Sequence, residues 1–248
     1  MTAAVDIAAN LAAVRARIAG AAARAGRDPA GIALVAVSKN QPDDAIRAAF
    51  AAGQREFGEN RVQELVHKAA ALADLPGLRW HMVGSLQTNK VEDLLRVRGL
   101  ALVHSLDRPR LADALQQALA ATGRTLPVLL QAHVTDEATK HGCAPADAAL
   151  LVRHVALNCP LLLVAGVMAM GPAQGDPAPA FARAIALRDE LHHALAALPR
   201  ARAPELATVS LGMSGDLEAA VAAGSTLVRI GTDVFGPRPG REAAPRAT

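Results

Sequence analysis

The chain has 248 residues, of which 52% are hydrophobic, and its formal net charge is +3. Aromatic residues make up 2%, with no tyrosine, and no Lys/Arg run forms a basic stripe, which argues against nucleic-acid binding. Two cysteines, Cys143 and Cys159, fit neither a disulfide framework nor a metal-ligand spacing, so we expect free thiols. Polar residues interrupt the apolar N-terminal pattern, which argues against a signal peptide or membrane span and favours a cytoplasmic protein.

Apolar residues recur at helical spacing from residue 7 to residue 18 and predict an N-terminal helix that ends near Gly26. Strand and helix patterns then alternate along the rest of the chain. The expected strands are Ile32–Lys39, Arg55–Gly58, Arg79–Val83, Leu100–Ser105, Leu126–His133, Leu161–Met168, Leu206–Leu211 and Thr226–Ile230.

This alternation predicts an α/β fold, a single (β/α)8 barrel of the TIM type over residues 1–236, with an extra N-terminal helix that covers one open face. An open doubly wound sheet is the alternative. It requires a glycine-rich dinucleotide turn after the first strand, and Ser38-Lys39-Asn40-Gln41-Pro42 is not such a turn. We expect residues 237–248 to form a disordered tail.

One lysine, Lys39, closes the first predicted strand, and an amphipathic helix pattern begins soon after it. The continuous apolar run before it is typical of a strand buried on both faces of a parallel sheet. Burial at such a strand end lowers the pKa of a lysine and frees its amine to attack a carbonyl carbon. Taken alone, however, Lys39 is better explained as a lysine at a strand end whose side chain reaches solvent than as a reactive amine. The other strand ends therefore decide between the two interpretations.

In such a barrel, binding and catalytic residues gather at the carboxyl ends of the strands. Gly212-Met213-Ser214-Gly215-Asp216 runs from the seventh strand into a helix, and Arg229-Ile230-Gly231-Thr232 ends the eighth strand. Adjacent loops at these two places commonly bind phosphate, although each motif alone fits ordinary capping equally well. An amine and a phosphate site at one barrel mouth together fit pyridoxal 5'-phosphate, which carries an aldehyde and a phosphate.

Several long motifs resemble those of the pyridoxal phosphate homeostasis proteins and occur in that family's order. They are Val37-Ser38-Lys39, Phe57–Glu64, Trp80–Lys90, His104-Ser105-Leu106-Asp107, Gly166-Val167-Met168, Leu211–Asp216 and Arg229–Thr232. Residues 40 and 41, His133 and the segment 169–172 depart from the family's pattern. None of these departures touches the lysine or the phosphate loops.

That family consists of single-domain barrels related to the barrel half of alanine racemase, which bind pyridoxal phosphate through the motif lysine. The resemblance implies that Lys39 forms a Schiff base (an aldimine) with the cofactor. It also implies that Ser214, Gly231 and Thr232 hold the phosphate.

The same resemblance places Arg229 beside the pyridine nitrogen of the cofactor. An arginine there keeps that nitrogen unprotonated and weakens the ring as an electron sink. Asn60, His81 and Met213 are implied to line the cofactor.

Alanine racemase uses a lysine and a tyrosine as its two bases, and this chain has no tyrosine. We therefore expect a monomeric carrier in vitamin B6 and amino-acid homeostasis, which delivers pyridoxal phosphate to apo forms of its enzymes without robust catalysis, metal or membrane. A racemase-like enzyme using this cofactor is one alternative, and a Schiff-base aldolase with Glu59 as its acid is another. A zinc hydrolase that uses His81, His104 and His133 is a weaker alternative, because the sequence contains no paired-histidine motif that would fix the geometry of the ligands.

Overall fold

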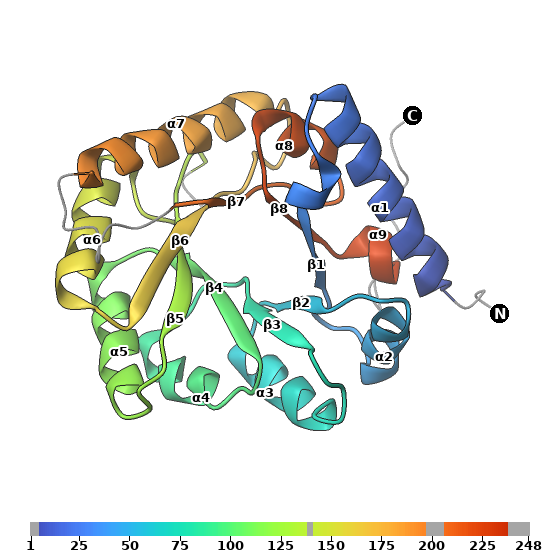
Figure 1. Ribbon diagram of the computed structural model, residues 1–248, viewed down its shortest axis with the longest axis horizontal. Helices are drawn as coiled ribbons and strands as arrows, with labels where there is room; N and C mark the ends of the chain where they lie inside the picture. Colours follow the sequence, from blue (N-terminus) through green and yellow to red (C-terminus); the bar gives the residue numbers. More distant parts are fainter. Residues whose placement is uncertain (1–4, 138–140, 197–205, 238–248) are drawn as a thin grey trace.

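Eight parallel strands close into a barrel in which each strand pairs with the next along the chain and β8 pairs with β1 (Figure 1). The computed structural model describes residues 5–137, 141–196 and 206–237. The strands are β1 (Ala33–Val37), β2 (Glu56–Glu59), β3 (Arg79–Met82), β4 (Leu100–Leu106), β5 (Leu126–Gln131), β6 (Leu162–Met168), β7 (Thr208–Ser210) and β8 (Leu227–Ile230).

The pairing of β8 with β1 closes the sheet and excludes the open doubly wound alternative. The predicted (β/α)8 barrel is therefore confirmed. The expected tail at residues 237–248 lies outside the described part of the chain, apart from Pro237.

Helices surround the barrel on its outside, and all of the connections between strands are crossovers to the next parallel strand (Figure 1). The helices are α1 (Ile7–Arg24), α2 (Asp43–Ala51), α3 (Val62–Ala71), α4 (Val91–Leu95), α5 (Pro109–Ala120), α6 (Pro145–Asn158), α7 (Ala178–Leu195), α8 (Leu217–Ala223) and α9 (Thr232–Phe235). Pro29–Gly31 and Thr88–Lys90 form short 3-10 turns. Within the described ranges, no helix has the length and apolar character needed to cross a membrane.

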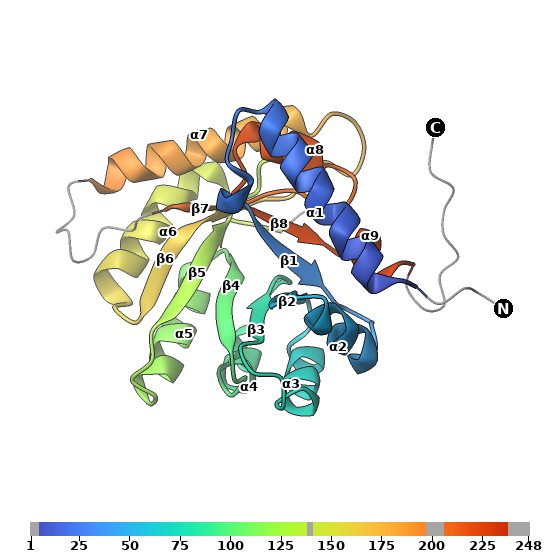
Figure 2. The ribbon, with the colours of Figure 1, turned by 45° about the vertical axis from the view of Figure 1, so that its right-hand side comes forward.

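The predicted N-terminal helix is α1, which lies along α8 and α9 on the outside of the barrel (Figure 2). Its start is fixed by Asp6, whose carboxylate accepts a hydrogen bond from the Ala9 N–H. Arg17 on α1 forms ion pairs with Glu218 and Asp233, which belong to α8 and α9. This helix thus binds the two short helices that follow β7 and β8.

The apolar core forms two layers. The larger layer lies between the strands and the surrounding helices, and the smaller one fills the barrel interior with Val35, Leu102, Leu129, Met168 and Leu227. Side chains of a strand point alternately to its two faces, so the interior takes every second residue. Four strands also carry buried polar side chains: His81 on β3, His104 on β4, Ser210 on β7 and Arg229 on β8.

Gly166 in β6 provides a test of this packing. It has a φ of +157°, and a Cβ atom built on it would lie 1.7 Å from the Thr208 carbonyl oxygen of β7. We expect Gly166→Ala to lower the free energy of unfolding by about 3 kcal/mol, as measured by urea denaturation. Gly31→Ala is the matched control, because nothing lies within 4 Å of its added Cβ, and equal effects of the two substitutions would contradict this account.

Candidate cofactor-binding site

The carboxyl ends of the strands surround a cavity of about 380 Å³. This volume lies within the range of about 300–1,000 Å³ that is typical of small-molecule sites. Its lining residues come from the ends of β1, β2, β3, β5, β6, β7 and β8. They are Val37, Lys39, Asn60, Val83, Gly84, Ser85, Gln131, Met168, Met170, Met213, Ser214, Gly215, Arg229, Gly231 and Thr232.

This cavity brings together all of the predicted site residues except His81. His81 shares a strand face with Val83, which lines the cavity, but lies two residues earlier and therefore one layer deeper in the barrel. Its Nδ1 atom lies 2.9 Å from His104 Nε2, and its Nε2 atom lies 2.5 Å from Glu56 Oε2. His81 is therefore an interior residue beneath the site.

Lys39 lies two residues beyond the end of β1, in a tight turn rather than in the strand. The Gln41 N–H donates a hydrogen bond to the Ser38 carbonyl oxygen at 3.0 Å, which closes the turn. Asn40 has a φ of +60°, a left-handed conformation that asparagine tolerates better than most residues. The turn directs the half-buried Lys39 into the cavity lining.

A second lysine holds this turn from below. Lys68 on α3 donates hydrogen bonds to the Ser38 carbonyl oxygen at 2.6 Å and to Glu59 and Glu64 at 2.7 Å each. Glu64 also accepts from the Asn40 N–H at 2.6 Å, and Glu59 from the Ser38 hydroxyl at 2.6 Å. We call Lys68, Glu59 and Glu64 the Lys68 clamp. It fixes the backbone on both sides of Lys39.

The clamp determines the state of Glu59, which is fully buried. Burial raises the pKa of Glu59, while Lys68 and the Ser38 hydroxyl favour its charged form. The Glu59 carboxylate contacts Lys68 rather than the cavity, and Glu59 is not among the cavity's lining residues. An aldolase acid beside Lys39 would have to come from another residue.

The loops after β7 and β8 adjoin one another at the mouth of the cavity. The Asp233 N–H at the start of α9 donates to the Ser214 hydroxyl at 3.4 Å, which links the two loops. Gly231 lies against β1, because a Cβ atom added to it would lie 3.2 Å from the Val37 carbonyl oxygen. The small size of Gly231 therefore brings the β8 loop next to the turn that carries Lys39.

Arg229 on β8 lies at the floor of the cavity and is 6% exposed. Its guanidinium donates to the Ser210 carbonyl oxygen at 2.8 Å, to the Ser210 hydroxyl at 2.6 Å and to the Ala169 carbonyl oxygen at 3.1 Å. Burial lowers the pKa of Arg229 to about 10, so its side chain stays protonated at neutral pH.

The charges around the cavity suit a phosphorylated aldehyde. Among the described residues that line it, Lys39 and Arg229 carry positive charge and none is acidic. Ser214 and Thr232 add hydroxyl donors, and glycines leave room for an anion close to the backbone. The donor set therefore fits an anionic ligand that presents a carbonyl carbon to an amine.

Some lining residues lie outside the predicted set. Gln131 lines the cavity, whereas His133, two residues later, bonds the Glu137 carbonyl oxygen through Nε2 at 3.0 Å and does not. The expected strand is two residues too long here, since β5 ends at Gln131. The apolar side chains of Met168 and Met170 also line the cavity. Their position at and just after the end of β6 was the sequence signal that could have identified them.

Both cysteines are buried free thiols, as expected. Burial raises the pKa of Cys143 and of Cys159 to about 11 in each case, which keeps both sulfurs protonated at neutral pH. Neither cysteine lines the cavity.

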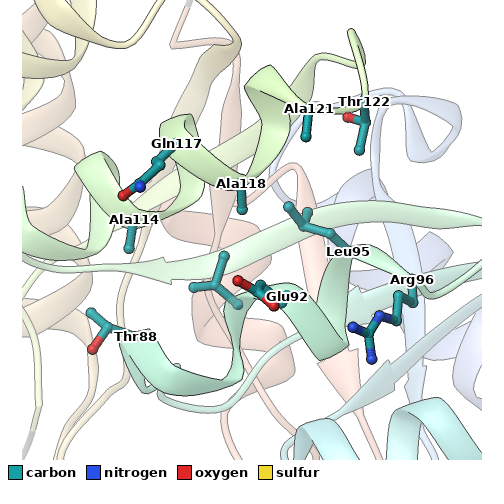
Figure 3. A pocket seen from close by; sticks show the side chains of 10 residues that line it. Thr88, Glu92, Leu95, Arg96, Ala114, Gln117, Ala118, Ala121 and Thr122 are labelled. Carbon is teal, nitrogen blue, oxygen red and sulfur yellow. The ribbon is translucent and has the colours of Figure 1, made fainter.

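A second hollow of about 500 Å³ lies on the outer wall between α4 and α5 (Figure 3). Its walls are mainly small or apolar side chains, such as Ala114, Ala118 and Leu95, with Glu92 and Arg96 at one side (Figure 3). It lies away from the carboxyl ends of the strands and has no amine beside a phosphate-sized donor set. The smaller cavity at the barrel mouth is therefore the candidate site.

The Lys68 clamp predicts a specific stability defect. Lys68→Met leaves the buried Glu59 carboxylate without its cation, and we expect a loss of about 3 kcal/mol in the free energy of unfolding. The loss should be larger at pH 8 than at pH 5, because a carboxyl with a raised pKa keeps its proton in the folded state and costs stability as pH rises. Lys90→Met, at the exposed pair with Asp93, should cost less than about 0.5 kcal/mol. Urea denaturation at both pH values measures the free energy of unfolding of each variant. A loss that does not depend on pH would contradict the role assigned to Lys68 beside Glu59.

Comparison with known proteins gives consistent matches over nearly the whole chain. The family model for the alanine racemase N-terminal domain matches residues 9–239. A pyridoxal phosphate homeostasis protein of Pseudomonas aeruginosa is 44% identical over 232 residues, which cover 94% of this chain and 96% of that protein. A protein of the same name from Bos taurus is 40% identical over 249 residues, covering 96% of this chain and 89% of that protein.

The solved structure of PipY from Synechococcus elongatus with pyridoxal phosphate bound is 36% identical to this chain, with a TM-score of 0.79. The match covers 93% of this chain and 100% of that one. The closed barrel and the sequence identity agree, and the chain belongs to the pyridoxal phosphate homeostasis protein family, on the barrel fold of the alanine racemase N-terminal domain.

Proposed function

We propose that this protein is a cytoplasmic, monomeric carrier of pyridoxal 5'-phosphate that holds the cofactor covalently through Lys39. One observation carries the proposal. The amine of Lys39, the guanidinium of Arg229 and the hydroxyls of Ser214 and Thr232 line one cavity whose described lining includes no carboxylate. The PipY structure with pyridoxal phosphate bound and the named relatives support the assignment of this cofactor.

When bound, the cofactor supplies an aldehyde carbon that an uncharged amine attacks, with water as the leaving molecule. Lys39 provides that amine from a turn fixed by the Lys68 clamp. Ser214, Gly231 and Thr232 would hold the phosphate, and Asn60 and Met213 would border the ring. A reversible link to Lys39 would allow transfer of the cofactor to an apo-enzyme.

Arg229 supports holding rather than catalysis. Its guanidinium has a pKa of about 10 and remains a proton donor at neutral pH, so we assign it a hydrogen bond to the ring nitrogen. A ring nitrogen that accepts a hydrogen bond without taking the proton withdraws electrons weakly. The chain has no tyrosine, and neither His81 nor His133 is among the described residues that line the cavity, so that none of these three candidates supplies the second base of a racemase there.

Covalent capture by Lys39 is directly testable. We expect the wild type to give a visible absorption band with pyridoxal phosphate, and borohydride to fix one cofactor per chain on Lys39, located by peptide mass spectrometry. Lys39→Ala should lose both, whereas Lys90→Ala, at a partly exposed lysine that does not line the cavity, should keep both. A full-stoichiometry adduct in Lys39→Ala would contradict the proposal at its central residue.

Carrier and enzyme differ in what they do to an amino acid. We expect the loaded protein to restore activity to an apo-enzyme that requires pyridoxal phosphate, and to leave the α-proton of L-alanine unexchanged in D₂O by NMR. Steady Lys39-dependent exchange, at rates of about 1 s⁻¹ or more as in ordinary enzymes, would instead establish the racemase-like alternative. Light scattering in the same buffer measures the molar mass and so tests whether the protein is a monomer.

A further inference from the structure

A row of polar side chains, buried except for the partly exposed Glu56, crosses the interior of the barrel beneath the candidate cavity. Glu56 Oε2 lies 2.5 Å from His81 Nε2, and His81 Nδ1 lies 2.9 Å from His104 Nε2. His104 Nδ1 lies 3.2 Å from the Ser210 hydroxyl, which is 2.6 Å from an Arg229 guanidinium nitrogen. We call these five residues the interior chain. It leads from the amino end of β2 to the floor of the cavity.

The two ends of the interior chain fix the direction of every hydrogen bond between them. A guanidinium only donates, so the Ser210 oxygen accepts from Arg229. Among the described residues, His104 Nδ1 is then the acceptor within reach of the Ser210 proton. His104 must therefore carry its own proton on Nε2 and donate it to His81 Nδ1. His81 in turn donates from Nε2 to the Glu56 carboxylate, which only accepts when ionised.

This assignment requires both histidines to be neutral and to carry their proton on Nε2. For His104 the surroundings agree, because burial, helped by His81 and Arg229, holds its pKa well below the ordinary value. The charged groups that face the chain are Arg229 on β8, Glu56 on β2 and the partly exposed Arg79 on β3, which pairs with Glu56 at 3.2 Å. Asp216 acts on Arg229 from the β7 loop.

We propose that His81, His104 and Ser210 are positioning residues for the cofactor site, acting as a one-directional hydrogen-bond chain that orients the Arg229 guanidinium toward the cavity. The proposal rests on the assignment of pyridoxal phosphate to that cavity. Ser210 offers Arg229 two acceptors, its carbonyl and its hydroxyl oxygen, and the histidines fix the hydroxyl by taking its proton. His81 therefore contributes to the site although it does not line the cavity.

The direction of the chain also couples its two ends. A second proton on His81 would make Nδ1 a donor toward His104 Nε2, which would move the His104 proton to Nδ1. The Ser210 hydroxyl would then accept from His104 and Arg229 together, and its own proton would lose its acceptor. A change of proton position at one end of the chain would thus change the hydrogen bonding of the Ser210 hydroxyl at the other end.

The first experiment needs no cofactor. In the ¹⁵N-histidine-labelled protein, long-range ¹H–¹⁵N correlation spectra distinguish the two neutral tautomers and the imidazolium. Resonances are assigned with His81→Asn and His104→Asn. We expect both histidines to be neutral with the proton on Nε2 at pH 7, and His104 to become a tautomer mixture in Ser210→Ala. A proton on Nδ1, or an imidazolium at either histidine, would overturn the proposal.

The second experiment measures the effect on the site. We expect Ser210→Ala to weaken pyridoxal phosphate binding about tenfold, the equivalent of one lost hydrogen bond, and to shift the visible band of the bound cofactor. Ser105→Ala is the matched control. Its hydroxyl is buried on β4 beside His104 and has no hydrogen-bond partner among the described residues, so its loss should change neither quantity.

The outcomes separate two kinds of failure. If the wild type binds no pyridoxal phosphate, the proposed function fails, and the tautomer spectra still decide whether the chain has the stated direction. If the wild type binds and Ser210→Ala equals Ser105→Ala in affinity and spectrum, the positioning role is refuted while the carrier function stands.

Discussion

The site depends above all on the pairing of β8 with β1, which joins the two ends of the described chain. In this register Val35 pairs with Arg229 and Ala36 with Ile230. The turn that carries Lys39 and the loop of Gly231 therefore leave neighbouring strands side by side at the same edge of the sheet. The amine of Lys39 and the loop of Gly231 therefore become two walls of one cavity, although they lie far apart in the sequence. An open sheet would separate these walls.

The buried Lys68 and the half-buried Lys39 carry the same amine in different surroundings, which suit different roles. Lys68 donates hydrogen bonds to Glu59, to Glu64 and to a carbonyl oxygen, which fix its position. Lys39 lines a cavity whose described walls hold no carboxylate. The first arrangement suits a structural ion pair, and the second suits an amine that reacts with an aldehyde. The carboxylates stand behind the turn and support it without neutralising the cavity.

The sequence predicted the parts of this protein that local pattern determines. Strand order, the N-terminal helix and the loops around Ser214 and Gly231 follow from apolar periodicity and from glycines at strand ends, and the structure contains them. The depth of His81 and the end of β5 at Gln131 depend on register, because two residues along a strand correspond to a different layer of the barrel. Lys68 was missed for another reason. Its partners come together only when α3 packs beside β1 and β2.

The interior chain explains why a barrel core accepts polar side chains at a place where apolar packing is more stable. Burying two imidazoles and a guanidinium costs free energy unless every donor meets an acceptor. Here the cost is offset by a chain whose proton positions are mutually dependent, since a guanidinium at one end and a carboxylate at the other leave one arrangement of hydrogens that satisfies all members. An apolar core would fill the same volume but would leave Arg229 with two backbone carbonyl oxygens as its acceptors. The interior chain adds the Ser210 hydroxyl as a third acceptor at the floor of the cavity.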